Sequence, residues 1–189
     1  MKRPDKVSTK SDLLNTAIEL FRGNGYDKVS IMQICRACEV SKTAFYFHYR
    51  SKEDLILDFY NTTQIKLEKN LSLILQGKRA IDRLWALHEL YLRHVESLGT
   101  AILREVYKIY LSRKDFPNPI FNQRLNETKT TLLNQAKKDR EIPAHADTVQ
   151  LSEAMSFTLN GALFLWLLCD GSFDLVKRAK QGYYCILGA

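Results

Sequence analysis

The sequence contains only four cysteines and begins without the apolar segment of a signal peptide, since Met1 to Lys10 is polar and charged. All four thiols fall within apolar stretches of the chain, at Cys35, Cys38, Cys169 and Cys185. This use of cysteine predicts reduced thiols and a cytoplasmic location.

The sequence also lacks a hydrophobic run long enough to cross a bilayer. Its longest apolar run, 157–169, is interrupted by Thr158, Asn160 and Gly161. The run falls short of the roughly 18–20 residues that a membrane span needs. We therefore expect no membrane partner.

The residues of a catalytic or metal centre are missing as well. No nucleophile is accompanied by a base and an orienting group, and no metal site is evident. Cys35 and Cys38 have the spacing of a redox dithiol or half a zinc site. None of the four histidines completes such a site, so we favour two small packing residues. The sequence predicts no catalytic residues, no metal, no cofactor and no enzyme.

Positive charge is concentrated near the N-terminus. The 189 residues carry a net charge of +7 and are 46% hydrophobic, enough to fill a core. Residues 1–52 hold ten Lys and Arg against five Asp and Glu, whereas residues 53–189 hold eighteen against sixteen. A basic N-terminal segment indicates an anionic partner such as nucleic acid.

Apolar residues recur at helical spacing along almost the whole chain, and no segment alternates with period two. The sequence therefore predicts an all-α fold of about nine helices. We expect them near residues 11–22, 31–38, 42–49, 52–75, 81–95, 102–110, 118–140, 146–170 and 172–187.

Two short helices lie close together in the basic segment. Ser30 and Ser41 are each placed to cap a helix, because a serine hydroxyl accepts a hydrogen bond from an amide in the first turn. The connection 39–41 is only three residues long. This arrangement fits a helix-turn-helix at about 30–49, within an N-terminal domain of residues 1–52.

The second of these helices carries four aromatic residues and a histidine in five consecutive positions. Phe45 and Tyr49 are four residues apart and share one face, which we expect to pack inward. Outward side chains can donate to phosphate oxygens, and Lys42 and Thr43 can reach base edges. Phe47 can pack on a thymine methyl group.

The stretch AIELFRGNGYDKVSIMQICRACEVSKTAFYFHYRSKEDL, residues 17–55, resembles the TetR family of transcriptional regulators. Its part VSKTAFYFHYRSKEDL matches the family's recognition helix and the start of the next helix without a gap. The resemblance implies base contacts by Lys42, Thr43, Ala44 and Phe47. It also implies phosphate contacts by Ser30, Ser41, Tyr46, His48 and Lys52.

Two features depart from the family pattern. Glu39 stands in the turn where the family often has glycine, so we expect a strained or altered turn there. Cys35 and Cys38 stand where small residues such as alanine are usual.

The resemblance further implies a homodimeric repressor of a palindromic double-stranded DNA operator, released by a small-molecule effector. Residues 53–189 would form the helical regulatory and dimerisation domain. Candidates for the effector pocket are Trp85, His88, Tyr91, Tyr107, Tyr110, Phe157 and Asn160. Candidates for the dimer interface are Leu159, Leu163, Trp166, Leu175, Ala179, Tyr183 and Ile186.

Other interpretations of these residues stay open. His88 fits a hydrogen-bonded core histidine as well as a pocket residue. The apolar segment 157–169 is also compatible with full burial inside one chain. The alternative functions are an all-helical protein-interaction module and a regulator without a small-molecule effector.

Overall fold

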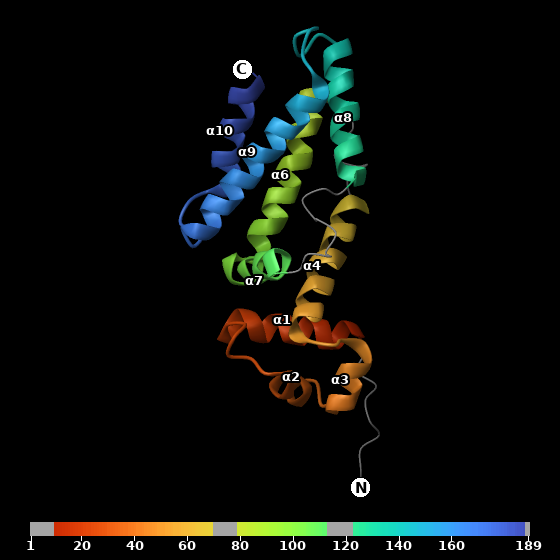
Figure 1. Ribbon diagram of the computed structural model, residues 1–189, viewed down its shortest axis with the longest axis vertical. Coiled ribbons are helices and arrows are strands. Elements are labelled where there is room, and N and C mark those ends of the chain that lie inside the picture. The colour runs from red at the N-terminus through yellow and green to blue at the C-terminus, as the bar shows by residue number, and fades with distance from the viewer. Residues whose placement is uncertain (1–9, 70–78, 113–122, 188–189) are drawn as a thin grey trace. The chain divides into compact units, whose positions relative to one another are not determined.

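A computed structural model describes residues 10–69, 79–112 and 123–187 (Figure 1). Throughout these ranges the regular structure is helical and no strand is present, which confirms the predicted all-α class. The helices are α1 Lys10–Asn24, α2 Ile31–Ala37, α3 Lys42–His48, α4 Lys52–Lys69, α6 Ala80–Leu98, α7 Thr100–Ser112, α8 Gln123–Lys138, α9 Thr148–Leu168 and α10 Leu175–Leu187.

The observed helix boundaries differ from the predicted ones mainly at helix starts, where a capping side chain sets the first helical residue. Asp147 caps α9 by accepting hydrogen bonds from two first-turn amides, at 3.0 and 3.1 Å. Asp174 accepts from the amide of Lys177 at 2.8 Å, so α10 begins three residues later than predicted. The predicted end of α4 near 75 and the predicted start of a helix near 118 lie outside the described residues.

The chain divides into two compact units, and the division does not follow the predicted boundary at residue 52. The first unit comprises Met1–Ile65 and Ala101–Lys114, and the second comprises Lys66–Thr100 and Asp115–Ala189. Much of α4 and nearly all of α7 thus belong with α1, α2 and α3. Tyr60 of α4 and Tyr110 of α7 illustrate this, since their ring centroids lie 6.3 Å apart.

The core of the first unit is built from the apolar faces that the helical spacing predicts. Leu13, Ala17 and Phe21 of α1 are buried together with Ile34 of α2 and Phe45 of α3. Burying such side chains supplies the main favourable term in folding. The core therefore holds the helix-turn-helix against α1.

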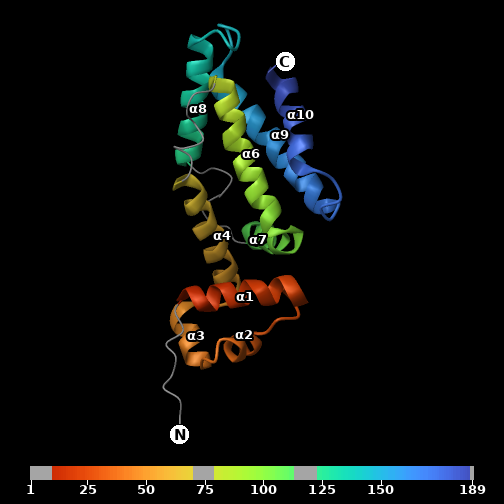
Figure 2. The ribbon, with the colours of Figure 1, turned by 180° about the vertical axis from the view of Figure 1, so that it is seen from behind.

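In the second unit, α6, α8, α9 and α10 lie alongside one another (Figures 1 and 2). By length and composition, α9 is the only helix in the described part of the chain that could cross a membrane. It contacts both α8 and α10, and one of its faces is buried against them. We therefore interpret it as the core helix of this unit.

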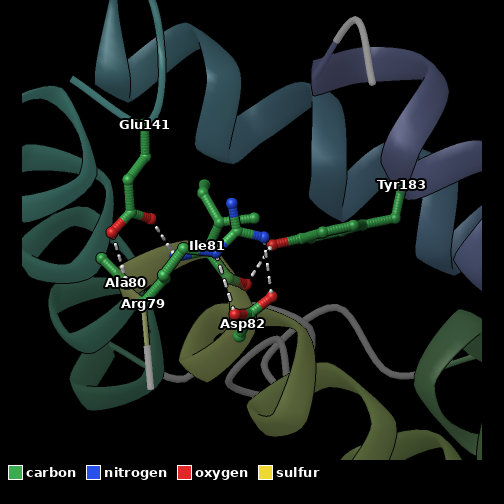
Figure 3. A network of polar contacts seen from close by, with 6 residues as sticks. All are labelled: Arg79, Ala80, Ile81, Asp82, Glu141 and Tyr183. Atoms are coloured by element: carbon green, nitrogen blue, oxygen red, sulfur yellow. Dashed lines mark hydrogen bonds and ion pairs between the residues drawn. The ribbon is translucent and has the colours of Figure 1, made fainter. Parts of the chain in front are cut away.

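A carboxylate from the end of α8 caps the start of α6 (Figure 3). Glu141 accepts hydrogen bonds from the backbone amides of Ala80 and Ile81 at 3.0 and 2.9 Å. The N-cap residue, Arg79, makes no side-chain cap of its own. On the other side, the Tyr183 hydroxyl of α10 donates to the Ile81 carbonyl at 3.2 Å. The start of α6 thus depends on residues about 60 and 100 positions away.

We expect Glu141→Ala to lower the free energy of unfolding by about 1–2 kcal/mol, because two first-turn amides lose their acceptor. Glu141→Gln keeps one acceptor oxygen and should cost less. Chemical denaturation of the full chain measures both. Glu19→Ala removes an exposed glutamate from α1 and should change stability by no more than about 0.5 kcal/mol. Equal effects of Glu141→Ala and Glu19→Ala would contradict the capping role.

Candidate nucleic-acid interface

The first helix of the predicted helix-turn-helix begins with a reciprocal cap. The Ser30 hydroxyl accepts from the amide of Gln33 at 3.3 Å, and the Gln33 side chain accepts from the amide of Ser30 at 2.7 Å. Two amides that the helix itself cannot satisfy are thereby paired. This fixes the start of α2 through local sequence alone.

The turn between α2 and α3 passes through a left-handed residue. Glu39 has φ of 56°, and the amide of Val40 donates to the carbonyl of Cys35 at 2.9 Å, as in a Schellman motif. Only glycine adopts such a φ without steric cost. The prediction of a strained turn at Glu39 is thus confirmed.

α3 presents one face inward and one outward. Its start is capped by Ser41, which accepts from the amide of Ala44 at 3.1 Å. Phe45 and Tyr49 are buried, as their spacing predicts. Tyr46 and Phe47 remain 52% and 84% exposed. Both rings are therefore accessible from outside the first unit.

The Asp58 carboxylate of α4 fixes the orientation of α3. Its Oδ2 accepts a hydrogen bond from the Tyr49 hydroxyl at 2.8 Å and lies 2.9 Å from the Lys10 ammonium of α1. Burial, followed by the contact with Asp58, raises the pKa of Tyr49 well above its usual range. Tyr49 therefore remains a hydrogen-bond donor at any physiological pH. Asp58 was not among the predicted site residues, because nothing in the local sequence pattern links it to a tyrosine nine positions earlier.

The ammonium of Lys52, which was expected to contact phosphate, is bonded to backbone carbonyls of the protein. Its ammonium donates to the carbonyls of Tyr26 and Val29 at 2.9 and 2.8 Å and lies 4.2 Å from the centroid of the Tyr26 ring. These contacts hold the loop between α1 and α2 against the start of α4. The side chain of Lys52 thus has a structural role. Its ammonium has three N–H donors, two of which are used within the protein, so the predicted phosphate contact can use only the third.

The other predicted DNA-binding residues surround α3 with varied exposure. Lys42, Thr43, Ser30 and Ser41 are exposed, whereas Ala44 and His48 are partly exposed. The ring of His48 lies edge-on to that of Phe47, with centroids 5.0 Å apart. The structure thus gathers these residues at the two capped helix starts and along α3. Their division between bases and phosphates stays a prediction.

The cysteines of α2 occupy packing positions. Cys35 is buried, and burial raises the pKa of its thiol. The Cys38 sulfur lies 3.9 Å from the carbonyl oxygen of Asp12 in α1. Within the described ranges, no group of three or more His, Cys, Asp or Glu side chains is placed to hold a metal.

The predicted effector residues do not form one cluster. Tyr107 and Tyr110 belong to the first unit, and the other five belong to the second. Trp85 and His88 are buried beside Tyr183, with ring centroids 5.2 and 5.6 Å from it. Phe157 is exposed and does not lie in the interior of the second unit.

Most of the predicted dimer residues are buried within the chain itself. Six of the seven are buried inside the unit itself: Leu159, Leu163, Trp166, Leu175, Ala179 and Tyr183. Ile186 is partly exposed. The prediction assigned these apolar residues of α9 and α10 to an interface between subunits. In the structure they are buried where the two helices pack within one chain. The exposed apolar residues of α9 are Val149, Phe157, Phe164, Leu165 and Leu168.

Comparison with known proteins agrees with this architecture. Residues 13–59 match the sequence profile described as bacterial regulatory proteins, tetR family. The HTH-type transcriptional regulator AcrR of Shigella flexneri is 25% identical across 98% of this chain and 90% of its own length. Residues 13–59 thus match the DNA-binding part of the TetR family. These similarities indicate a DNA-binding transcriptional regulator rather than an enzyme.

The other similar proteins match either a short part of the chain or nearly all of it. UidR of Escherichia coli is 42% identical over 48 residues, which are 25% of this chain and 24% of UidR. The structure of FadR from Thermus thermophilus, solved in complex with lauroyl-CoA, superposes with a TM-score of 0.64 over 95% of this chain and 93% of that one. Its sequence identity is 19%, so this likeness concerns the fold.

The exposed face of α3 generates a prediction that separates base from phosphate contacts. Thr43→Ala should change the base preference at one position of the site. The free-energy difference between the preferred base and the other bases there should fall by about 1–3 kcal/mol. Tyr46→Phe removes one hydroxyl and should weaken binding to all sequences by a similar factor, because phosphates are the same everywhere. Selection from a random DNA pool, followed by titration of the recovered site and of random DNA, measures both.

The outcome that contradicts this division is an equal loss on specific and random DNA for both variants. Unfolding midpoints serve as the control, since neither exposed side chain supports the core. Lys52→Ala is unsuitable here, because it would also release the loop between α1 and α2.

Proposed function

We propose that this regulator is a cytoplasmic homodimeric repressor that binds a palindromic operator and releases it when a small-molecule effector binds. The observation that carries the proposal is the exposed aromatic and basic face of α3, held on a rigid support. A helix-turn-helix places such a helix in the major groove. Repression follows when the occupied operator overlaps the polymerase site.

An exposed apolar stripe on α9 supports the homodimer. Phe157, Gly161, Phe164 and Leu168 follow one another at intervals of four, three and four residues, which places them on one helix face. Leu168 is 63% exposed, and a Cβ added at Gly161 would meet nothing within 4 Å. A contiguous apolar face of this kind typically marks an interface. Two copies of α9 and α10 would bury it in a four-helix contact.

The rigid link between α3 and α4 supports control of DNA binding by movement of α4. Only residues 49–51 separate the two helices, and the Tyr49 hydroxyl is bonded to Asp58 of α4. A rotation of α4 would therefore carry α3 with it and alter the spacing of the two recognition helices in the dimer. An effector achieves this only by binding one conformation more tightly, and near-complete switching needs a ratio of roughly 10⁴, about 5.5 kcal/mol.

The second unit is the proposed place for the effector. Its interior includes buried polar groups on α6 and α8, which an exclusively structural core would avoid. The similar FadR of Thermus thermophilus was solved with lauroyl-CoA bound, so this fold accommodates a small molecule.

The decisive experiment is selection of DNA from a random pool by the purified full chain at several salt concentrations, with its mass in solution recorded alongside. We expect recovery of a palindrome with half-sites about one helical turn, or a multiple, apart. Affinity should fall steeply with salt, because phosphate contacts release counterions. A folded protein that enriches no sequence at low salt would refute the proposal and favour a protein-interaction module.

The α9 stripe predicts a variant that separates the subunits. Leu168→Glu should convert a dimer into a monomer, because a carboxylate would have to be buried in the interface. The monomer should lose operator affinity, since only one half-site can then be engaged. Light scattering and operator titration measure the two effects.

Leu111→Glu is the matched control, because Leu111 is also an exposed leucine, 86% accessible, but lies on α7. It should leave the mass unchanged. A Leu168→Glu protein with the mass of the unaltered chain would show that α9 is not the dimer contact.

A further inference from the structure

A single residue, Gly99, separates α6 from α7. Its φ of 80° and ψ of 157° fall in a region of backbone conformation that is essentially restricted to glycine. A Cβ added there would meet nothing within 4 Å, so the backbone conformation, and not packing, requires glycine at this corner. Because glycine adopts many conformations, the corner by itself fixes the direction of α7 only loosely.

The residue after the corner is bonded to a distant turn of the second unit. The Thr100 hydroxyl donates to Oδ1 of Asp170 at 3.0 Å. Thr100 is the first residue of α7, and Asp170 lies in the turn between α9 and α10. The first amides of a helix have no acceptor within it and favour a nearby negative charge. The Asp170 carboxylate therefore suits the start of α7 in hydrogen bonding and in charge.

The turn that contributes Asp170 has a closely defined backbone. Asp170 and Gly171 have φ of 54° and 75°, and the amide of Gly171 donates to the carbonyl of Trp166 at 2.8 Å, which forms a Schellman motif at the end of α9. A Cβ added at Gly171 would lie 3.3 Å from Thr100 Cγ2 and 3.3 Å from Trp166 Cζ2. The turn thus packs closely against Thr100 as well as bonding to it.

The place of Thr100 in the chain gives this contact a meaning beyond the second unit. The chain passes from the second unit to the first between Thr100 and Ala101, and the rest of α7 belongs with the helix-turn-helix. Asp170 lies two residues after Leu168, the last residue of the exposed apolar stripe on α9. One hydrogen bond therefore joins the end of the proposed dimer helix to the residue from which the chain enters the DNA-binding unit.

The chain also crosses between the units inside α4, between residues 65 and 66. There a continuous helix restricts the backbone, because each turn is bonded to the next. The crossing at Thr100 instead follows a glycine corner. It is therefore the crossing that gains most from a fixing contact.

We propose that Thr100 and Asp170 are positioning residues for operator recognition, whose contact holds the DNA-binding unit of each subunit relative to the dimer contact on α9. The inference rests on the proposed homodimer. A palindromic operator requires two recognition helices at one spacing. A subunit that turns freely about Gly99 loses conformational freedom when both half-sites are bound, so it binds the palindrome more weakly.

The ratio of two affinities measures this role: the affinity for the palindrome recovered by selection, and that for a duplex cut to one half-site. Thr100→Val removes the hydroxyl and keeps the methyl group that lies against Gly171. We expect it to weaken palindrome binding by about two- to tenfold, the effect of one hydrogen bond, and to change half-site binding by less than about twofold. Fluorescence anisotropy measures both affinities. The mass in solution should remain that of a dimer.

Asp170→Gly is an independent variant of the same contact. Glycine suits the left-handed conformation at this position, so the unfolding midpoint should equal or exceed that of the unaltered chain. The carboxylate is lost, so the affinity ratio should nevertheless fall as it does in Thr100→Val. Because the two side chains form one contact, the double variant should lose no more than the larger of the two single losses.

Thr131→Val is the matched control. Thr131 is an exposed threonine of α8 whose hydroxyl donates to the Glu127 carbonyl of the same helix at 2.8 Å. Its replacement should leave the affinity ratio unchanged. Three results overturn the proposal: a Thr100→Val dimer with the ratio of the unaltered chain, equal weakening of palindrome and half-site binding, or a double variant whose losses add.

The two proposals fail in distinguishable ways. A chain that is monomeric or selects no palindrome refutes the proposed repressor, and the positioning role with it. A dimer that binds its palindrome with an affinity ratio insensitive to Thr100→Val refutes only the positioning role.

Discussion

Lys10, Tyr49 and Asp58 meet at a single carboxylate, and the presentation of α3 depends on this contact. α3 has only seven residues, too few to hold its own position in water. The core beneath Phe45 anchors it, but apolar packing alone leaves its orientation loosely specified. The hydrogen bond from Tyr49 and the ion pair with Lys10 tie the end of α3 and the start of α1 to Asp58 of α4. The orientation of the outward face of α3 therefore depends on the position of α4.

In the second unit, α6 has a well-bonded start and, further along, a buried histidine whose ring nitrogens have no partner among the described residues. Glu141 and Tyr183 satisfy backbone groups at the start of α6, so that end of the helix is well supported. One or two turns further along the same helix, His88 is buried without a partner among the described residues. A protein interior ordinarily pairs such groups.

The sequence predicted well what local rules control. Ser30 and Ser41 cap the helices that they were expected to cap, and Glu39 adopts the left-handed conformation that the turn requires. It predicted poorly what depends on contacts between distant elements. α7 joins the first unit although it follows α6 in the chain, and the predicted dimer residues of α9 and α10 instead pack those two helices together. Apolar spacing identifies a buried face but does not say whether the same chain or another one buries it.

By itself, the sequence determined the all-α class, the helix-turn-helix and which face of α3 is buried, because capping, turn conformation and helical periodicity act over only a few residues. The tertiary structure alone decided that Lys52 supports a loop, that Asp58 orients α3, and that Glu141 caps the start of α6. Each of these outcomes needs residues from different helices to come within a few ångströms. Such proximity is set by how whole helices pack, which no local pattern encodes.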